Sequence, residues 1–309
     1  MDPVHALTVV IPAYNEADGL PRVLSALREA LADCPSSGVV VVDDGSADAT
    51  AEVARELGAT VVRHERNRGN GAALKTGLAQ ARTELVAIMD ADGQHRPEDL
   101  PRLLEALEGH DMVVGTRQLD PDAHWIRRWG NRLLCGVASY LVRQPVPDLT
   151  CGYRVFRRRL LAPYLSLFPD GFGFDAAATV CFLSNGHRVR FEPVEVPARV
   201  TGTSKIRPLR DGARYLAIVW RLVLLFHPLR GFLPLAGCCL GLGLLWGLVA
   251  LLIFRDGLSV AALLFMVTGL LIALLGVVAD QLSELRRQLA VAISAWEEAH
   301  PGTEPEAGR

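Results

Sequence analysis

Leu85-Val86-Ala87-Ile88-Met89-Asp90-Ala91-Asp92-Gly93-Gln94 is a short apolar segment that runs directly into two carboxylates. Its first five residues predict a buried strand, and the Asp-x-Asp that follows lies at the carboxyl end of that strand. A second apolar segment, residues 39–42, is likewise followed at once by Asp43 and Asp44. Since ligands of open parallel sheets bind beyond the carboxyl ends of the strands, the two acidic clusters predict one site at one sheet edge.

Strands and helices alternate through the first third of the chain. Expected strands cover residues 7–12, 39–42, 60–63, 85–89 and 112–115, and expected helices cover residues 17–32, 49–57, 70–82 and 98–107. This alternation predicts an α/β fold, a Rossmann-like and mostly parallel sheet with helices on both faces. Residues 119–199 are less regular, with a helix expected near 131–142 and a strand near 188–193.

Composition excludes several classes of protein. A formal net charge of -2 over 309 residues argues against nucleic-acid binding, which needs a basic excess. The six cysteines form no Cys-x-x-Cys pair and indicate neither a zinc site nor a disulfide framework, which suits a reducing compartment. The first residues lack the basic and apolar regions of a signal peptide.

The last third of the chain predicts a membrane anchor. Residues 232–254 and 258–279 carry no charge, and each run, as a helix, spans about 30 Å, the thickness of the hydrocarbon core. The tight turn Arg255-Asp256-Gly257 joins them into a hairpin. Arginines flank the outer ends of the hairpin, so the positive-inside rule places both ends and the N-terminal domain in the cytoplasm.

Two further segments flank this hairpin. In residues 205–229 arginines interleave with apolar and aromatic residues, which predicts an interfacial amphipathic helix, with a core helix as the alternative. Residues 281–309 are expected to form a cytoplasmic helix and a disordered tail. The predicted domains are therefore a catalytic domain over 1–204, the interfacial helix over 205–229, the hairpin over 230–280 and the C-terminal segment.

The turn at Asp90 predicts a divalent cation site. Asp90 and Asp92, with Gln94 two residues on, offer hard oxygen ligands that suit Mg²⁺ or Mn²⁺ and leave open positions for a diphosphate. The simpler interpretation is that strand-end aspartates serve only as turn and cap residues. The glycine-rich stretch at residues 67–73 opens a helix, where small residues and the helix N-terminus favour an anionic ligand, although such helix starts are frequent.

Several motifs together resemble a known family. They are Pro12-Ala13-Tyr14-Asn15-Glu16, Val42-Asp43-Asp44-Gly45-Ser46, Arg68-Gly69-Asn70-Gly71 and Asp90-Ala91-Asp92-Gly93-Gln94-His95. In order and spacing the set resembles the inverting family-two glycosyltransferases with the GT-A fold. Arg199-Val200-Thr201-Gly202-Thr203-Ser204-Lys205 is similar to the Arg-x-x-Gly-x-Ser-Lys motif of the dolichyl-phosphate mannose synthase branch, which includes polyprenyl-phosphate glycosyltransferases with a C-terminal hairpin. The similarity spans about residues 6 to 285.

The resemblance implies a role for each matching position. The implied nucleotide-sugar ligands are Pro12, Tyr14, Glu16, Val42, Asp43, Asp44, Gly71, Asp90, Ala91, Arg117, Arg199 and Lys205. The implied metal ligands are Asp90, Asp92 and Gln94, the lipid-phosphate ligands are Arg127, Arg128 and Asn131, and the catalytic residues are Asp92, Arg117 and Asp175. Residues 148–154 and 172–175 match segments that line the sugar pocket.

The resemblance implies transfer of one hexose, from a GDP-mannose or UDP-glucose type of donor, to a polyprenyl phosphate at a membrane. A phosphate monoester is already an anion and needs positioning more than deprotonation, so Asp175 is expected to bind a sugar hydroxyl, with a role as general base as the alternative.

Three other functions are compatible with part of this pattern. A processive synthase would carry Gln-x-x-Arg-Trp, whereas here Trp125 precedes Arg128-Trp129 in place of the glutamine. A nucleotidyltransferase would not explain the hairpin, and a catalytically silent scaffold would bind nucleotide-sugar without turnover. Oligomeric state, a homo-oligomer included, stays open.

Overall fold

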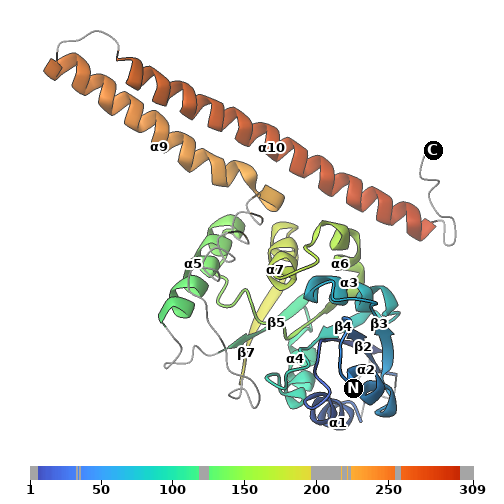
Figure 1. Ribbon diagram of the computed structural model, residues 1–309. Helices are drawn as coiled ribbons and strands as arrows, with labels where there is room; N and C mark the ends of the chain where they lie inside the picture. The colour runs from blue at the N-terminus through green and yellow to red at the C-terminus, as the bar shows by residue number, and fades with distance from the viewer. Residues whose placement is uncertain are drawn as a thin grey trace. The chain divides into compact units, whose positions relative to one another are not determined.

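The computed structural model of the chain describes residues 6–32, 34, 36–117, 125–195, 217, 221, 224–254 and 259–299. The chain divides into two compact units, the first ending at Tyr215 and the second beginning at Leu216. The first unit holds a sheet with helices on both faces, and the second holds a pair of long helices (Figure 1).

Within the described residues, the first unit contains one sheet of seven strands in the order β3-β2-β1-β4-β6-β5-β7. The strands are β1 Leu7–Ala13, β2 Gly38–Asp43, β3 Thr60–Arg63, β4 Leu85–Ile88, β5 Met112–Arg117, β6 Arg154–Arg157 and β7 Val189–Val194. The pairings of β6 with β4 and β5 are antiparallel and the others are parallel. The predicted α/β fold with a mostly parallel sheet is confirmed.

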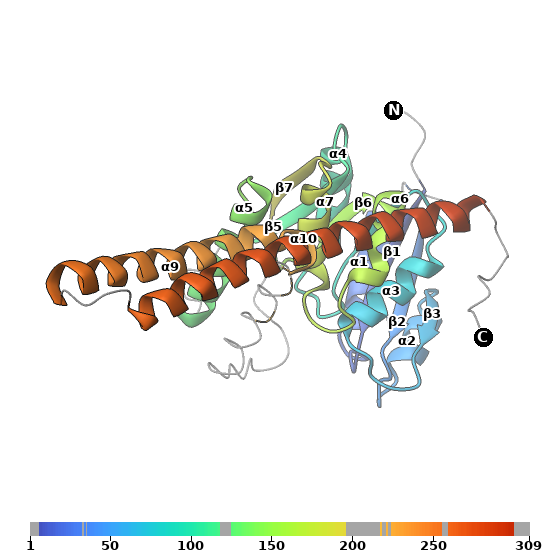
Figure 2. The ribbon, with the colours of Figure 1, turned by 90° about the horizontal axis from the view of Figure 1, so that it is seen from above.

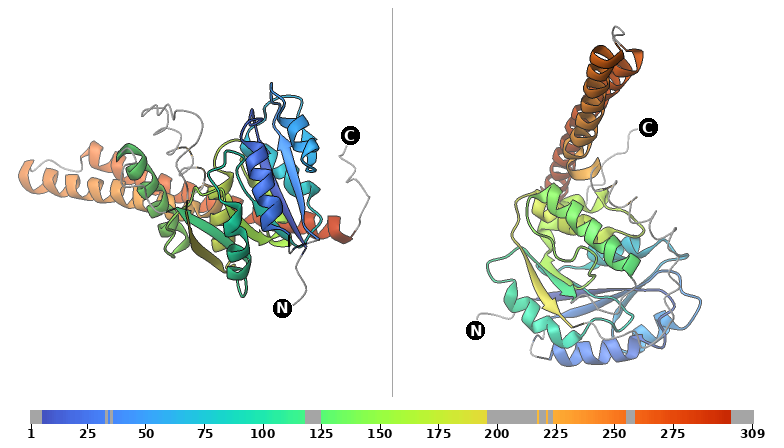
Figure 3. Two further views of the ribbon diagram at one scale, coloured as in Figure 1. Left: turned by 90° about the horizontal axis from the view of Figure 1, so that it is seen from below. Right: turned by 90° about the vertical axis from the view of Figure 1, so that its left-hand side faces the viewer.

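Helices cover both faces of this sheet. They are α1 Leu20–Ala30, α2 Thr50–Glu56, α3 Asn70–Gln80, α4 Leu100–Ala106, α5 Trp125–Val142, α6 Arg158–Leu161 and α7 Phe174–Ser184, with short 3-10 helices η1 Pro97–Asp99 and η2 Ala162–Leu167. Helices α1, α2 and α4 lie on one face, and α3, α6 and α7 lie on the other (Figures 1 and 3). A Cβ on Gly77 would lie 2.3 Å from Val10 Cγ1, so the absent side chain lets α3 pack closely on β1.

Strand β6, helix α7 and the short helices α6 and η2 between them escaped prediction. Strand β6 is four residues long and has an arginine at each end. Its apolar centre, Val155 and Phe156, is too short to show the alternation of apolar and polar residues that marks a strand. Helix α7 is apolar all round, with nine of its eleven residues buried, so it lacks the polar face that marks an amphipathic helix. Helix α5 also begins at Trp125, six residues before the expected start.

The second unit is a helical hairpin. Helix α9 Pro228–Val249 continues through a π-helical turn, η3 Ala250–Phe254, and α10 Val260–Ala299 runs back beside α9 (Figures 1 and 2). Glycines sit where the helices meet, since a Cβ on Gly243 would lie 3.0 Å from Ala262 O, and one on Gly269 would lie 2.9 Å from Ala236 O. Small residues at such contacts are what close packing of membrane helices requires.

The hairpin has the length and composition of two membrane spans, Pro228–Leu252 and Val260–Ile293. Most of its large apolar side chains are exposed, Leu244, Leu252, Leu264 and Val278 each by about three fifths or more. A soluble core helix would bury such side chains, so the exposure favours a lipid-facing hairpin.

The C-terminal helix expected at residues 281–298 is not a separate element. Helix α10 continues through Asp280 without a break, because no proline or glycine lies between Gly276 and the end of the helix. The turn at Arg255, the tail from residue 300 and the boundary at residue 204 lie outside the described residues. Of the expected interfacial helix, residues 217, 221 and 224–226 are helical, whereas the helix is interrupted at His227 and residues 228–229 belong to α9. Ser283 Oγ donates to Leu225 O.

Candidate active site

The acidic turn lies where the sequence places it, beyond the carboxyl end of β4. Asp90 and Asp92 are partly exposed there, and Asp92 Oδ1 accepts a hydrogen bond from the Gln94 amide at 3.0 Å. The chain after β1 lies alongside, since a Cβ on Gly19 would lie 3.3 Å from Glu16 Oε2 and 3.4 Å from Ala91 O. The ends of β1 and β4 therefore bring three carboxylates to one edge of the sheet.

Residues 148–154 form the wall behind this turn. Gly152 packs directly against the Asp90 carboxylate, because a Cβ there would lie only 2.7 Å from Asp90 Oδ2. The described residues contain no cluster of three His, Cys, Asp or Glu side chains fit to hold an ion. The donor set available is thus two carboxylates and the Gln94 amide, which fits a hard cation that takes its remaining oxygens from a diphosphate and water.

Arg117, at the end of β5, is held by Asp148. Its Nε lies 2.9 Å from Asp148 Oδ2, its Nη2 lies 3.2 Å from Oδ1, and Nη2 also donates to Thr150 Oγ1 at 2.5 Å. Burial opposes the charges of both partners, but the hydrogen bonds and the ion pair outweigh it, so the pKa of Arg117 is raised and that of Asp148 is lowered. Both side chains stay ionised, and Arg117 is held close enough to Asp90 for the two charges to interact.

Arg154 and Asp175 form a second ion pair, between β6 and the first turn of α7. The Arg154 side chain is completely buried, and its Nη1 donates to Asp175 O at 2.7 Å and to Thr179 Oγ1 at 3.2 Å. Its Nη2 donates to Cys151 O and lies 3.4 Å from Asp175 Oδ1. Burial raises the pKa of Asp175 to about 6, although Arg154 opposes the shift. The charge of Asp175 therefore changes only slightly below neutral pH.

His95 lies beneath the acidic turn and is buried. The Asp90 amide lies 3.1 Å from His95 Nδ1, and the ring stacks on Tyr153 with centroids 5.1 Å apart. Burial lowers the pKa of His95 to about 4 and raises that of the neighbouring Cys151 thiol to about 12, so both are neutral at neutral pH. The pKa of Asp175 responds to Asp90, His95 and Arg117, and that of His95 to Asp92, which places all these groups around one site.

The predicted nucleoside ligands after β2 make contacts within the protein, and their role as ligands stays a prediction. Val42 is fully buried in the sheet. Asp43 accepts a hydrogen bond from the Ser46 amide at 2.9 Å and pairs with Arg63 at 3.1 Å. Asp44 accepts from His64 Nδ1 at 2.6 Å, and it also accepts from the amides of Arg68 and Gly69, at 2.9 and 2.8 Å. These carboxylates shape the loops on the donor side of the site.

The partner of Asp44 was missed because nothing in its sequence context marks it. His64 comes directly after a four-residue strand and has no patterned neighbours. Pro12 and Tyr14 remain predicted nucleoside ligands, and Tyr14 is half exposed at the end of β1. An open pocket lined by Gly45, Ser46, Arg63, His64 and Glu65 lies at the ends of β2 and β3, on the same side of the site.

The start of α3, which holds the predicted ligand Gly71, contacts the segment before α7, and its ligand role stays a prediction. The Gly71 amide donates to Gly171 O at 3.2 Å, and the Ala72 amide donates to Asp170 O at 2.7 Å. Lys75 Nζ lies 2.7 Å from both Phe168 O and Asp170 Oδ1. The Gly71 and Ala72 amides are thus occupied by the segment before α7, which leads to Asp175.

We expect Gly71→Ala to destabilise the first unit, which holds the candidate active site and is called the catalytic unit below. The Cβ of the alanine would lie 2.1 Å from Pro169 O and 2.9 Å from Asp170 O. Neither backbone atom can move without breaking the contacts of α3, and overpacking of this kind costs about 1–3 kcal/mol or more. Thermal unfolding of the detergent-solubilised chain measures the effect. Gly136→Ala is the matched control, because a Cβ there meets nothing within 4 Å. Equal melting temperatures for the two variants would contradict the assignment.

Several predicted ligands cannot be placed. Arg199 and Lys205 lie outside the described residues, and Arg127 and Arg128 are described only as backbone within α5. Asn131 is partly buried on α5, with the Cys135 thiol 3.9 Å from its Oδ1. The roles of these residues stay predictions.

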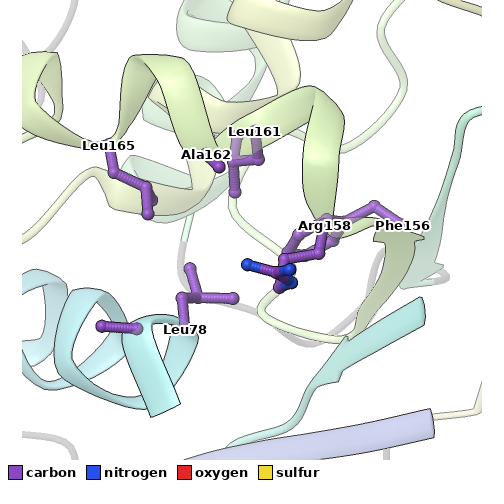
Figure 4. A pocket seen from close by; sticks show the side chains of 7 residues that line it. Leu78, Phe156, Arg158, Leu161, Ala162 and Leu165 are labelled. Atoms are coloured by element: carbon purple, nitrogen blue, oxygen red, sulfur yellow. The ribbon is translucent and has the colours of Figure 1, made fainter. Parts of the chain in front are cut away.

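An apolar pocket of about 140 Å³ lies elsewhere on the catalytic unit, between α3 and α6 (Figure 4). It is lined by Leu78, Ala79, Phe156, Arg158, Leu161, Ala162 and Leu165. Phe156 and Arg157 pair with Val86 and Leu85 at the start of β4, whereas the acidic turn follows the end of that strand. The pocket is therefore separate from the candidate active site.

Comparison with protein families agrees with this geometry. The family described as "Glycosyl transferase family 2" matches residues 8–165, which hold the first six strands and the acidic turn. The chain belongs to glycosyltransferase family 2. A second family, described as "GtrB C-terminal hairpin", matches residues 227–285, the α9 and α10 segment.

Individual relatives resemble one or both parts of this glycosyltransferase. Polyprenol monophosphomannose synthase of Mycolicibacterium smegmatis is 33% identical over 66% of this chain and 82% of its own. Glycosyltransferase AglJ of Haloferax volcanii is 29% identical over 92% of this chain and 95% of its own. Undecaprenyl-phosphate 4-deoxy-4-formamido-L-arabinose transferase of Edwardsiella ictaluri is 37% identical over 52% of each, so this chain spans about half the length of that relative.

Solved structures share the fold of the catalytic unit. Glucosyl-3-phosphoglycerate synthase of Mycobacterium tuberculosis, in complex with Mn²⁺, UDP and its product, superimposes with a TM-score of 0.58 at 25% identity. The match covers 71% of this chain and 79% of that one. Another structure of that enzyme, with Mg²⁺ and UDP, has a TM-score of 0.57 at 24% identity. The GT-A fold predicted from the motifs is confirmed.

Proposed function

We propose that this glycosyltransferase moves one hexose from a nucleotide-diphosphate sugar, of the GDP-mannose or UDP-glucose type, to a polyprenyl phosphate, with inversion. One observation carries the proposal: the acidic turn of a family 2 site and a hairpin with exposed apolar side chains occur in one chain. Such a combination suits a lipid acceptor, because its phosphate stays at the membrane surface while the donor is soluble. The names of two relatives, which specify sugar transfer to polyprenol or undecaprenyl phosphate, support it.

In the proposed reaction, an acceptor phosphate oxygen attacks the anomeric carbon. The bond from that carbon to the nucleoside diphosphate breaks, and its electron pair leaves with the diphosphate. Asp90, Asp92 and Gln94 would hold Mg²⁺ or Mn²⁺, which stabilises the charge that develops on the departing diphosphate. Arg117 adds a fixed positive charge near Asp90, since its pair with Asp148 prevents the guanidinium from swinging away.

The remaining predicted ligands divide between the two substrates. Arg199 and Lys205 bind the donor diphosphate, and Arg127, Arg128 and Asn131 bind the lipid phosphate. Attack by a phosphate needs no proton removal, so Asp175 serves to bind a sugar hydroxyl. Its carboxylate lies on the first turn of α7, held against Arg154 from behind.

In the proposed topology the hairpin anchors the enzyme, and the flanking arginines support a cytoplasmic location of the catalytic unit. Arg230 precedes the first apolar run, and Arg286 and Arg287 follow the second. Cysteine labelling of permeabilised and intact cells tests this orientation, because a cysteine introduced at Gly257 should react only from outside the cytoplasm.

Membranes that contain the protein test the activity. They are incubated with a panel of nucleotide-sugars and a polyprenyl phosphate, and the glycolipid is identified by mass. Formation of one hexosyl polyprenyl phosphate supports the proposal. A polymer would indicate a processive synthase, and binding of nucleotide-sugar without any glycolipid would indicate a silent scaffold.

The pH profile tests the role of Asp175. Because its pKa in the folded protein is raised to about 6, the carboxylate is lost as pH falls through this value, and its ionisation costs stability as pH rises through it. We expect transfer to decline on the acid side with a midpoint near pH 6. Asp175→Asn should give a lower rate of sugar transfer, and this rate should no longer decline on the acid side (the acid limb of the profile). An unchanged acid limb in this variant would assign it to another group.

A further inference from the structure

We propose that His95 is a positioning residue, whose Nδ1 fixes the Asp90 amide and thereby sets the geometry of the cation-binding turn. This inference rests on the proposed function, since the turn matters only if it binds the cation of the donor complex. His95 itself touches neither substrate nor cation in this proposal, because its side chain is only 4% exposed.

The contact requires one form of the ring. The Asp90 amide points at Nδ1 from 3.1 Å, and a backbone N–H can only donate, so Nδ1 must carry a lone pair. The ring proton then lies on Nε2, which faces Cys151 Sγ at 4.0 Å. This assigns the tautomer from the identity of the donor.

The ring is also held in place on its flat side. It stacks on Tyr153 with an interplanar angle of 22°, and both side chains are buried. Rotation of the ring would break this stacking together with the amide contact. The wall segment therefore fixes His95, and His95 fixes the first residue of the turn.

Asp90 is constrained from two directions as a result. Its amide is tied to His95 Nδ1, and its carboxylate rests against Gly152, where a Cβ would lie 2.7 Å from Oδ2. The carboxylate position is thus set by contacts on both sides before any ligand arrives. Partners that orient a cation's ligands in this way typically change its affinity by about 10- to 100-fold when they are removed.

The test compares two substitutions at one position. His95→Leu fills the buried space with an apolar side chain but removes the hydrogen-bond acceptor. His95→Asn instead keeps an acceptor oxygen near the position of Nδ1. Electron paramagnetic resonance of free Mn²⁺ measures cation affinity of the full chain in detergent, with UDP or GDP present. We expect His95→Leu to weaken Mn²⁺ binding about 10- to 100-fold and His95→Asn to recover most of that loss.

A control separates positioning from general stability. Leu103→Ala, in the buried core at α4, lowers stability without touching the turn and should leave Mn²⁺ affinity unchanged. In kinetics, His95→Leu should raise the Mn²⁺ concentration needed for half-maximal transfer more than it lowers the rate at saturation.

Two failures are distinguishable. If His95→Leu binds Mn²⁺ as tightly as the wild type, or if His95→Asn is as weak as His95→Leu, the positioning role is wrong and the proposed function stands. If the wild-type chain binds no Mn²⁺ with either nucleotide, the cation site itself is wrong, and the inference falls with it.

Discussion

Asp92→Asn should lower the rate of sugar transfer about a thousandfold, because a cation at a departing diphosphate is worth several kcal/mol and each 1.4 kcal/mol is a factor of ten. The asparagine keeps the oxygen that accepts from the Gln94 amide at 3.0 Å, so the turn should survive. What it removes is one of the two charges at the end of β4. The rate of glycolipid formation at saturating donor measures the effect.

Chelation should have the same effect on the wild type. Excess chelator should abolish transfer, and either Mn²⁺ or Mg²⁺ should restore it. Glu105→Gln removes an exposed carboxylate from α4 and serves as the control, since it should leave both rate and cation dependence unchanged. Full activity of the wild type in excess chelator would refute the cation role.

The sequence was most informative where a strand and a functional residue are neighbours in the chain. Asp90 and Asp92 follow β4 directly, so the apolar run that predicts the strand also predicts which edge the carboxylates reach. The same reasoning placed Asp43 and Asp44 correctly at the end of β2 but could not tell that they face inward. Their partners are Arg63, the last residue of the neighbouring strand β3, and His64, which follows it, and pairing between segments distant in sequence leaves no local pattern.

The wall behind the site was less accessible to prediction for a different reason. Arg154 is a completely buried arginine in a strand of four residues, and a sequence pattern counts it as polar. Its burial depends on acceptors from two distant parts of the chain, Cys151 O and the first turn of α7. Only the assembled fold brings these acceptors to it, so the residue that supports Asp175 could be inferred by resemblance of the segment but not by periodicity.

Arg154→Met should be the most destabilising change in the catalytic unit that we describe. Methionine fills much of the same volume, but it leaves Cys151 O and Asp175 O without their buried donor and the Asp175 carboxylate without its ion-pair partner. Removing one partner of a buried ion pair costs about 3–5 kcal/mol, because the other charge remains without compensation. For a unit of about 200 residues this corresponds to a fall in melting temperature of about 6–20 °C.

The companion change tests whether the charge of Asp175 causes this loss. In the double variant Arg154→Met with Asp175→Asn no uncompensated carboxylate remains, so we expect its melting temperature to lie above that of Arg154→Met alone. Lowering the pH should act in the same direction, since the pKa of Asp175 is raised to about 6 even with Arg154 present, and losing the arginine raises it further. The fall in melting temperature caused by Arg154→Met should therefore be smaller at pH 5 than at pH 8. Thermal unfolding of the four proteins of this cycle, at both values of pH, measures the coupling. A deficit that is independent of pH and unaffected by Asp175→Asn would mean that the lost carbonyl hydrogen bonds, and not the ion pair, make Arg154 necessary.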